Sequence, residues 1–334
     1  MAGTGTAHLR EHDAPDVVLS VRNLVVEYDT GSSGRVHAVS GVSLDILRGE
    51  TLGLVGESGC GKSTLAKAVM QLPSPTSGEV LFMGDDLTSL SPRALRSARR
   101  PVQMIFQDPI SSLNPLRKVR HIVAEGLEVA GGRSKAERAA MVDEMMDIVG
   151  LDPETAGDRR PHEFSGGQCQ RISIARAMVV EPEVVICDEP VSALDVSVQA
   201  QILNLLEDMK NRYGLTLLFI AHDLAVVKNI SDRVVVMYLG KICEVADPDL
   251  LYAEPAHPYT AAMLSAAPEP DPDVKPSTLT LSGDLPSPHD PPSGCRFRTR
   301  CPRATSLCAE TEPEIREVGP QHYVACHFPL IEAP

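Results

Sequence analysis

The segment from Gly56 to Thr64 has the residue types and spacing of a phosphate-binding loop. It fits the pattern G-x-x-x-x-G-K-[ST] in full and lies between an apolar run and a helical pattern. Its glycines let successive N–H groups point at a phosphate, and the following helix adds the positive end of its dipole. We expect Lys62 to reach the β- and γ-phosphates, Ser63 to ligate Mg²⁺ and Thr64 to lie near the α-phosphate. The candidate binding residues are Gly56, Glu57, Ser58, Gly59, Cys60, Gly61, Lys62, Ser63 and Thr64.

An acidic pair at the end of another apolar run is the second candidate for phosphate chemistry. Val184 to Cys187 is apolar and of strand length, and Asp188 and Glu189 follow it. Acids at a strand end are common as helix caps. Beside a phosphate loop, however, one carboxylate can hold Mg²⁺ through water and the next can polarise an attacking water as general base. We therefore predict Asp188 as a Mg²⁺ ligand and Glu189 as the catalytic base.

The segment from Phe164 to Gln168 offers a second phosphate-binding surface. Gly166 and Gly167 precede a helical pattern and expose N–H groups, and Ser165 adds a hydroxyl donor. A flexible helix cap would explain this segment if it stood alone. Because the first loop already meets the needs of one nucleotide, we expect Ser165 to Gln168 to contact the γ-phosphate held by another subunit.

His222 directly follows an apolar run, Leu217 to Ala221, that is predicted to be a strand. A histidine in that position is often a hydrogen-bonded structural residue. Next to a nucleotide it can sense the γ-phosphate and help to position water, which is the role we predict here. Gln107 and Asp195 lie in two further polar segments and complete the set of candidates.

Apolar patterns predict strands at residues 17–21 and 24–28 and a helix from Lys62 to about Leu72, and the spacing from Ser134 to Glu137 is that of a capping box. Apolar runs that alternate with helical patterns favour an α/β core with a mostly parallel sheet. The motifs together resemble those of the ATP-binding-cassette (ABC) ATPases, in family order and over residues 17–265. The resemblance implies a P-loop NTPase fold with a RecA-like core, an antiparallel β subdomain and a helical subdomain at about residues 108–165. It also implies ATP and Mg²⁺ as cofactors and a role for each motif. By this resemblance, Tyr28 stacks on adenine, with a strand-edge core tyrosine as the alternative, and Gln107 contacts Mg²⁺ and the membrane partner. The named motifs of the family are Walker A at Gly56 to Thr64, the signature at Ser165 to Gln168, Walker B at Asp188 and Glu189, the D-loop at Asp195 and the switch histidine at His222.

The same resemblance implies a head-to-tail pair of ATPases, with ATP between the Walker A loop of one and the signature of the other. The chain has one full set of motifs, and no apolar run approaches the roughly 18–20 residues that span a bilayer. We therefore expect a second ATPase subunit and two transmembrane permease subunits as partners. The second ATPase is expected to be a different chain, with an identical chain as the alternative. Cys169 departs from the polar residue that usually follows the signature, and we expect it to alter packing at the dimer seam.

Composition limits the classes of partner. The chain has 334 residues and a formal net charge of −14, which argues against binding to nucleic acid or anionic lipid through non-specific charge. Residues 1–16 form a small, polar tail with no hydrophobic signal-peptide segment. We expect a peripheral position on the cytoplasmic face of the membrane, with cysteines that are reduced thiols or metal ligands.

Residues 266–334 differ in amino-acid composition from the rest of the chain and are predicted to be a C-terminal extension. They hold 13 of the 27 prolines and four of the eight cysteines. The segments His257 to Thr260 and Leu281 to Pro288 resemble the extension found in ATPases of dipeptide and oligopeptide importers, closest to their F-type subunit. Nickel importers belong to the same group, and in all of them an extracytoplasmic binding protein selects the substrate.

Four cysteines of the extension are candidate metal ligands, with spacings of 5, 6 and 17 residues. The tight C-x₂₋₄-C pair of a structural zinc site is missing. A [4Fe–4S] cluster suits four thiolates in a loop-rich segment, and the resemblance implies one as well. Zinc and the absence of any metal remain alternatives. Zinc is an alternative because three nearby histidines could ligate it: His289, His322 and His327. The four predicted ligands are Cys295, Cys301, Cys308 and Cys326.

The predicted function is ATP hydrolysis that drives an ABC importer of dipeptides or oligopeptides. One alternative is the ATPase of a nickel or other solute importer. An alternative of another class is a non-transport ABC protein that acts on ribosomes or nucleic acid. That class usually carries two cassettes or a long coiled-coil insertion, and neither is found in this sequence.

Overall fold

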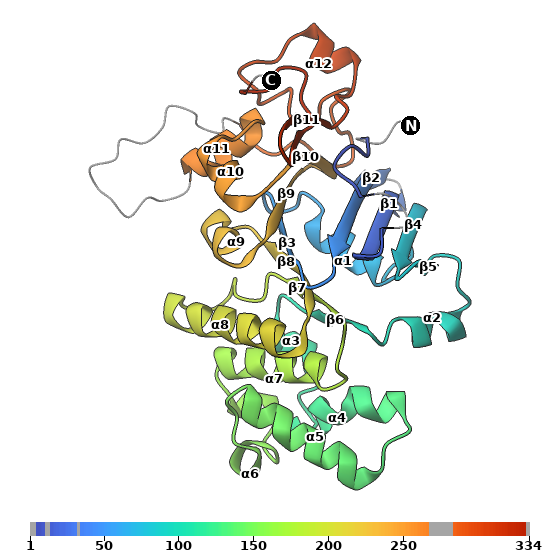
Figure 1. Cartoon of the computed structure of the whole chain (residues 1–334), viewed down its shortest axis with the longest axis vertical. Helices are drawn as coiled ribbons and strands as arrows, with labels where there is room; N and C mark the ends of the chain where they lie inside the picture. The colour runs from blue at the N-terminus through green and yellow to red at the C-terminus, as the bar shows by residue number, and fades with distance from the viewer. Residues whose placement is uncertain (1–4, 11–13, 32–33, 267–282, 332–334) are drawn as a thin grey trace. The chain divides into compact units, whose positions relative to one another are not determined.

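The computed structural model describes residues 5–10, 14–31, 34–266 and 283–331. The chain divides into two compact units, each of which is described by itself (Figure 1). Unit 1 comprises residues 1–90 and 221–334, and unit 2 comprises residues 91–220. The α/β fold predicted from the sequence is confirmed, with sheets of mixed direction.

An antiparallel sheet of four strands belongs to unit 1. Its order is β2 (Arg35–Leu47), β1 (Val17–Asp29), β4 (Ser77–Phe82) and β5 (Asp85–Asp86). The two strands predicted at residues 17–21 and 24–28 are one continuous strand, because a bulge at Asn23 carries the chain through the break in pattern. Asn23 has a φ of 46°, a conformation that asparagine tolerates, and its N–H donates to the Ser43 hydroxyl at 2.9 Å.

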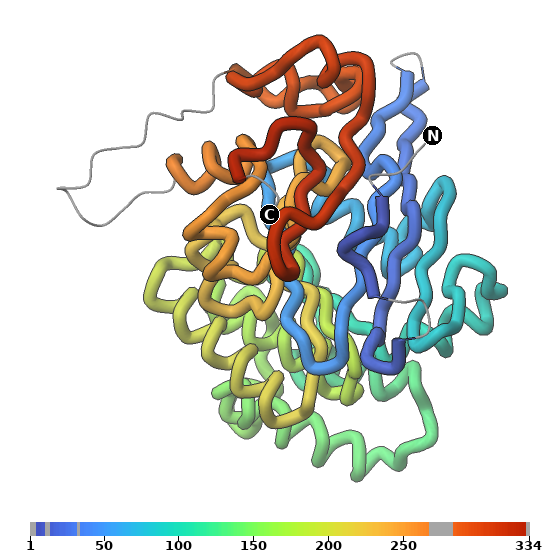
Figure 2. Tube along the Cα trace, turned by 45° about the horizontal axis from the view of Figure 1, so that its top comes forward, coloured from blue at the N-terminus to red at the C-terminus, as the bar shows by residue number. Residues whose placement is uncertain are grey.

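A second set of strands in unit 1 follows the order β11 (Arg316–Gly319), β12 (His322–Val324), β10 (Lys241–Ala246), β9 (Arg233–Tyr238) and β3 (Thr51–Val55). β3 and β9 are parallel, whereas the other pairs are antiparallel. β12 lies in the red part of the chain in Figure 2 and pairs with β10. The helices of this unit are α1 (Lys62–Val69), α9 (Leu224–Ile230), α10 (Pro248–Ala253), α11 (Pro258–Ala266) and α12 (Ser306–Glu310).

Helix α1 begins at the predicted residue but ends at Val69, three residues before the predicted end at Leu72. Gln71 has a φ of 55°, which a helix cannot continue, and Pro73 disfavours helical backbone at the residue before it.

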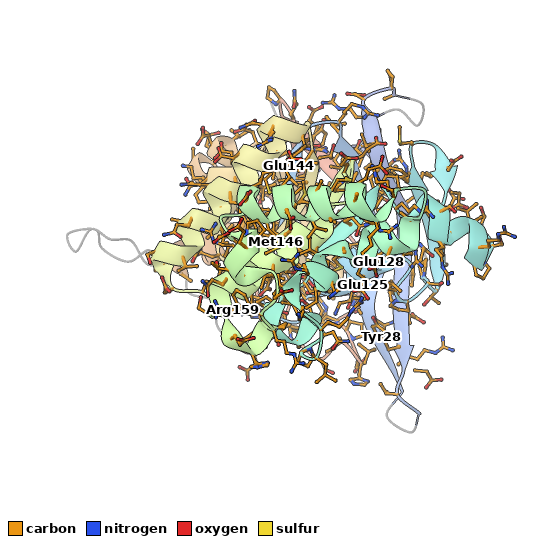
Figure 3. The ribbon with its side chains drawn as sticks, turned by 90° about the horizontal axis from the view of Figure 1, so that it is seen from below. Tyr28, Glu125, Glu128, Glu144, Met146 and Arg159 are labelled. Atoms are coloured by element: carbon orange, nitrogen blue, oxygen red, sulfur yellow. The ribbon has the colours of Figure 1, made fainter. Side chains whose placement is uncertain are left out.

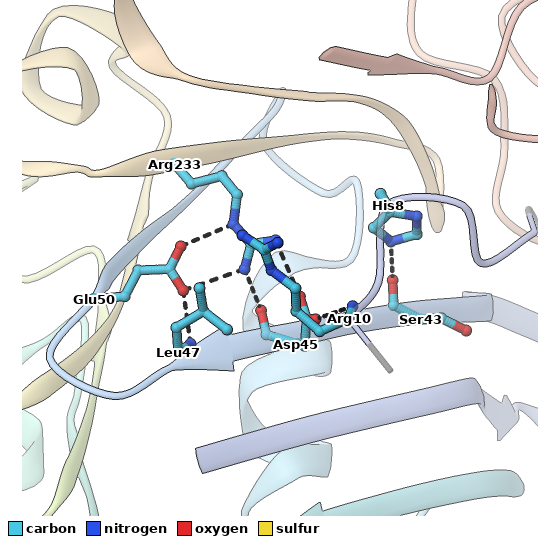
Figure 4. Close-up of polar contacts among 7 residues, drawn as sticks. All are labelled: His8, Arg10, Ser43, Asp45, Leu47, Glu50 and Arg233. Carbon is cyan, nitrogen blue, oxygen red and sulfur yellow. Dashed lines mark hydrogen bonds and ion pairs between the residues drawn. The ribbon is translucent and has the colours of Figure 1, made fainter. Parts of the chain in front are cut away.

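A buried ion-pair network joins the start of β9 to the end of β2 and to the turn between β2 and β3 (Figure 4). The guanidinium of Arg233 donates to Asp45 at 3.0 Å and to Glu50 at 2.8 Å. The side chain of Asp45 is fully buried, and it also accepts a hydrogen bond from the N–H of Arg10. The network therefore joins segments that are up to 223 residues apart, from Arg10 to Arg233.

Unit 2 has a parallel set of three strands, β6 (Val102–Ile105), β7 (Val184–Asp188) and β8 (Thr216–Ala221), in the order β8-β7-β6. β7 is buried along its whole length, as the apolar run predicts. The other elements are α2 (Pro92–Ala98), α3 (Pro109–Ser112), α4 (Val119–Ala130), α5 (Lys135–Ile148), α6 (Pro153–Ala156), the 3₁₀ helix η2 (Pro161–Glu163), α7 (Gly166–Met178) and α8 (Val196–Tyr213).

Unit 2 carries exposed charge pairs on its surface. Glu125 and Glu128, labelled on α4 in Figure 3, pair with Arg117 at 3.0 and 3.5 Å. These side chains are one-third or more exposed, so each pair contributes less than about 1 kcal/mol. In neither unit do the described residues include a helix that is both long and apolar enough to cross a bilayer.

Candidate functional site

The phosphate loop of unit 1 has a backbone that requires glycine at two places. The loop joins the end of β3 to the start of α1. A Cβ on Gly56 would stand 2.1 Å from the carbonyl oxygen of Met237. Gly61 has a φ of +107°, and a Cβ there would stand 2.1 Å from the carbonyl oxygen of Ala38. No side chain fits at either position, so these two glycines are required by the fold of the loop itself.

Lys62 lies folded over this loop. Its ammonium group donates to the carbonyl oxygens of Gly56 at 2.7 Å and Glu57 at 3.1 Å, and the residue is 4% exposed. The helix that follows has Gly61 as its N-cap and receives no side-chain cap. A cation and an uncapped helix N-terminus at one loop form a site for an anionic phosphate group.

Tyr28 and His222 are the other predicted site residues of unit 1. Tyr28, labelled in Figure 3, lies near the end of β1. Its side chain is 37% exposed. His222 directly follows β8 and is exposed as well. Both rings are therefore accessible to a ligand.

The acidic pair of unit 2 lies at the end of β7, as the sequence predicts. Asp188 is the last residue of the strand and is 2% exposed. Glu189 follows with a φ of +47°, and its N–H donates to the carbonyl oxygen of Ile220 at 3.0 Å. A non-glycine residue in this conformation is strained and often marks a functional position.

Gln107 contacts Glu189 directly. The side-chain amide of Gln107 donates to the Glu189 carboxylate at 3.0 Å, across 82 residues of sequence. This hydrogen bond occupies the carboxylate that is predicted to take a proton from water. It brings together two residues that the sequence analysis assigns to separate motifs.

The signature segment of unit 2 forms the N-terminus of α7. The Ser165 hydroxyl accepts from the N–H of Gln168 at 3.3 Å, and the Gln168 side chain accepts from the N–H of Ser165 at 3.0 Å. The two polar side chains thus cap their own helix in a capping box. A Cβ on Gly167 would stand 2.6 Å from Val198, so this glycine allows the start of α7 to lie close to α8.

Asp195 and Cys169 have structural partners within unit 2. Asp195 caps α8, and hydrogen bonds from Ser197 and Val198 lower the pKa of its carboxyl. Cys169 is 1% exposed, its thiol donates to the carbonyl oxygen of Pro161 at 3.5 Å, and burial raises its pKa. The side chain of Cys169 is therefore inside unit 2, and its effect on packing at the dimer interface stays a prediction.

Four cysteines of the C-terminal segment line a single cavity in unit 1. All eight cysteines of the chain are free thiols. Burial raises the pKa of Cys295 and of Cys326 to about 11, so both are neutral thiols at pH 7 when no metal is bound. The cavity is lined by Cys295, Cys301, Cys308 and Cys326 together with His257 and Phe297.

In the part of the chain that the structure describes, no three His, Cys, Asp or Glu side chains are grouped to hold a metal ion. The predicted [4Fe–4S] cluster and its zinc alternative are therefore not supported by the structure. Two of the histidines considered as zinc ligands have other hydrogen-bond partners. His322 pairs with Glu244 at 2.6 Å, and His327 contacts the carbonyl oxygen of Thr311 at 2.9 Å.

Comparison with known proteins identifies the family. Residues 39–192 match the family described as ABC transporter. Residues 243–308 match the family described as the C-terminal region of oligopeptide/dipeptide transporters. A peptide import ATP-binding protein of Brucella ovis is 53% identical over 309 residues, which are 92% of this chain and 97% of the relative. The oligopeptide transport ATP-binding protein OppF of Escherichia coli is 54% identical over 294 residues, 87% of each chain.

The chain belongs to the ATP-binding proteins of the oligopeptide/dipeptide ABC transporter family.

Solved structures agree with this identification. The dimeric ATP-binding cassette MJ0796 bound to ADP and Pi covers 69% of this chain and 98% of its own, with a TM-score of 0.63 and 29% identity. CbiO1 of Clostridium perfringens, part of the transporter complex cbiONQ, covers 72% of this chain and 92% of its own, with a TM-score of 0.63 and 32% identity. The predicted P-loop NTPase fold is confirmed. This ABC ATPase couples ATP hydrolysis to transport, and the non-transport alternative has no support.

Proposed function

We propose that this ABC ATPase drives the import of oligopeptides or dipeptides as an F-type subunit. Relatives at 52–54% identity are named for oligopeptide transport, and the C-terminal region matches that of such transporters. The observation that carries the mechanism is the hydrogen bond between Gln107 and Glu189. One of these residues is predicted to face the membrane partner and the other to activate water. A change at either one is therefore transmitted directly to the other.

The proposed chemistry is phosphoryl transfer from ATP to water. When bound, Mg²⁺ would neutralise negative charge on the phosphates. The phosphate loop with Lys62 would bind the phosphates, and Ser63, Gln107 and Asp188 would offer oxygen ligands to Mg²⁺. Glu189 takes a proton from the attacking water.

The remaining site residues complete a shared site between two subunits. His222 senses the γ-phosphate and Tyr28 stacks on adenine. The signature, Ser165 to Gln168, contacts the nucleotide held by the partner, and Asp195 lies at the same seam. ATP then binds where two chains meet, and its hydrolysis separates them.

The proposed assembly contains this chain, a second ATPase subunit of different sequence, two transmembrane permease subunits and an extracytoplasmic peptide-binding protein. The chain would lie peripherally on the cytoplasmic face of the membrane. We propose residues 1–16 as a tail, 17–265 as the ABC ATPase domain with a helical subdomain at about 108–165, and 266–334 as the peptide-importer extension. Of the segment quoted for that extension, Leu281 and Ser282 lie outside the described residues.

Glu189→Gln in the assembled transporter tests the mechanism. We expect hydrolysis to fall by about 10²–10⁴-fold, because general-base catalysis is lost while nucleotide binding remains. ATP should then hold the two ATPase subunits together. Glu207→Gln, an exposed acid on α8, is the matched control and should hydrolyse ATP normally. Undiminished hydrolysis in Glu189→Gln would remove Glu189 from the mechanism, and failure of ATP to join the subunits would overturn the shared site.

Uptake in a strain that lacks the gene tests the substrate. Peptide uptake should be lost and should return with the wild-type chain but not with Glu189→Gln. Restoration of nickel uptake, with peptide uptake unaffected by the deletion, would instead favour the solute alternative.

We also propose that Cys295, Cys301, Cys308 and Cys326 are the ligands of a [4Fe–4S] cluster, as the family resemblance implies. The four thiols line one cavity, although the described residues include no group of three such side chains already placed to hold a metal ion. A cluster would cross-link and stabilise the cysteine-bearing segment, which has little regular secondary structure. Protein purified without oxygen should be brown and contain about four irons per chain. Cys301→Ser should lose this iron and the control Cys169→Ser should keep it. A colourless protein that contains zinc, or no metal, would contradict the proposal.

A further inference from the structure

We propose that Arg300 is a positioning residue for the phosphate loop. Arg300 belongs to the cysteine-bearing C-terminal segment and immediately precedes Cys301. It holds and neutralises Glu57, the second residue of the loop. The C-terminal segment thereby sets how tightly the loop binds ATP, an inference that rests on the proposed function.

The contact between Arg300 and Glu57 is a bidentate ion pair. One guanidinium nitrogen of Arg300 donates to Glu57 Oε2 at 2.6 Å and the other donates to Oε1 at 3.0 Å. The Arg300 side chain is 6% exposed and that of Glu57 is 27% exposed. Paired geometry and burial distinguish this contact from the exposed charge pairs of unit 2.

Tyr259 fixes the backbone of the same residue. Its hydroxyl accepts a hydrogen bond from the N–H of Glu57 at 2.8 Å, and its ring is fully buried. The Tyr259 ring packs against Tyr238, with centroids 4.7 Å apart, and against Phe297 at 5.4 Å. Phe297 lies between Cys295 and Cys301 in sequence, so one aromatic cluster joins the cysteine segment to the loop.

Two more contacts bring the C-terminal segment to the phosphate loop and the adjacent strand. Leu285 Cδ2 stands 3.9 Å from the position of a Cβ on Gly59. The carbonyl oxygen of Pro288 accepts a hydrogen bond from the N–H of His37 on β2 at 2.9 Å. Residues 259, 285 and 300 therefore all reach the loop, although they lie about 200 residues or more beyond it.

The charge of Glu57 explains why the loop needs Arg300. The loop is built to bind a polyanion, and a carboxylate within it repels the phosphates unless a cation neutralises it. Arg300 supplies that cation and also prevents the carboxylate from turning toward the nucleotide. Loss of Arg300 should therefore weaken ATP binding, and removal of the Glu57 charge should restore much of what is lost.

The test measures the Kd of the full-length chain for a fluorescent ATP analogue with Mg²⁺. Arg300→Met should raise Kd about tenfold, because the carboxylate of Glu57 is then left beside the phosphates without its cation. Arg300→Lys keeps the charge but not the paired geometry, so its Kd should lie between those of wild type and Arg300→Met. Arg298→Met is the matched control, because Arg298 donates to the carbonyl oxygen of Ser293 within its own segment and should leave Kd unchanged.

The double variant Glu57→Gln/Arg300→Met separates positioning from folding. We expect it to bind ATP at least threefold more tightly than Arg300→Met, because the unpaired charge is gone. In the assembled transporter, Arg300→Met should raise KM for ATP with little change in kcat. Thermal unfolding of each variant checks that the fold is kept.

Two results would overturn the proposal. One is a wild-type Kd in Arg300→Met. The other is a double variant that binds no better than Arg300→Met, which would make Arg300 a merely structural residue. A wild-type chain that fails to bind ATP would instead contradict the proposed function, so the two failures are distinguishable.

Discussion

His257 should make the protein less stable in acid. It precedes α11, is 1% exposed, and its Nδ1 accepts a hydrogen bond from the N–H of Tyr259 at 3.0 Å. Its ring packs against Phe297, with centroids 5.8 Å apart. Burial lowers the pKa of His257 from 6.5 to about 4, and the nearby Glu244 carboxylate opposes this shift in part. The folded protein thus holds this histidine neutral.

The direction and size of the effect follow from this lowered pKa. Between pH 6.5 and pH 4 the unfolded chain protonates His257 and the folded chain does not, so the unfolded state binds more protons. The stability is therefore fully present above about pH 6.5 and is lost as the pH falls toward 4. With those two pKa values, the free energy of unfolding should drop by about 2 kcal/mol between pH 7 and pH 5.

Denaturant unfolding of wild type and His257→Asn at pH 7 and pH 5 measures this contribution. The asparagine side chain can accept the same N–H but does not titrate in this range. Other groups titrate in both proteins, so the relevant quantity is the difference between the two pH effects. When the pH is lowered from 7 to 5, the free energy of unfolding of His257→Asn should fall by about 2 kcal/mol less than that of wild type. His289→Asn, an exposed histidine, should behave as wild type. An equal pH effect in His257→Asn and wild type would refute the reasoning.

Two other substitutions follow from the same structure. Gly61→Ala should abolish ATP binding, because its Cβ would stand 2.1 Å from the carbonyl oxygen of Ala38 at a φ that disfavours side chains, and nucleotide titration measures this. Arg233→Met should lower the free energy of unfolding by about 3 kcal/mol, because it leaves the fully buried carboxylate of Asp45 without its cation, and denaturant unfolding measures this.

Each of these two substitutions has a control. Gly84→Ala lies in open space outside the phosphate loop and should bind ATP as wild type does. Asp45→Asn combined with Arg233→Met removes the buried charge and should regain part of the lost stability. A Gly61→Ala protein with normal ATP affinity, or an Arg233→Met protein as stable as wild type, would contradict the respective argument.

Local patterns predicted the position of several elements. The run from Val184 to Cys187 is a buried strand, and the capping spacing at Ser134 forms a capping box at the start of α5. The boundaries were less accurate where a single residue leaves regular geometry. Asn23 joins two predicted strands through a bulge, and Gln71 ends α1 early. In both cases the deciding factor is a positive φ, which the pattern of apolar residues does not reveal.

The sequence by itself determined the phosphate loop, the acidic pair, the signature and the family. Each of these depends on residue types within a few positions, because a backbone that surrounds a phosphate needs glycine and lysine at set spacings. The tertiary structure alone decided which distant residues meet. Gln107 contacts Glu189 across 82 residues, and Arg300 contacts Glu57 across 243. Long-range pairs of this kind leave no local signal, since they depend on how strands and loops pack after the chain has folded.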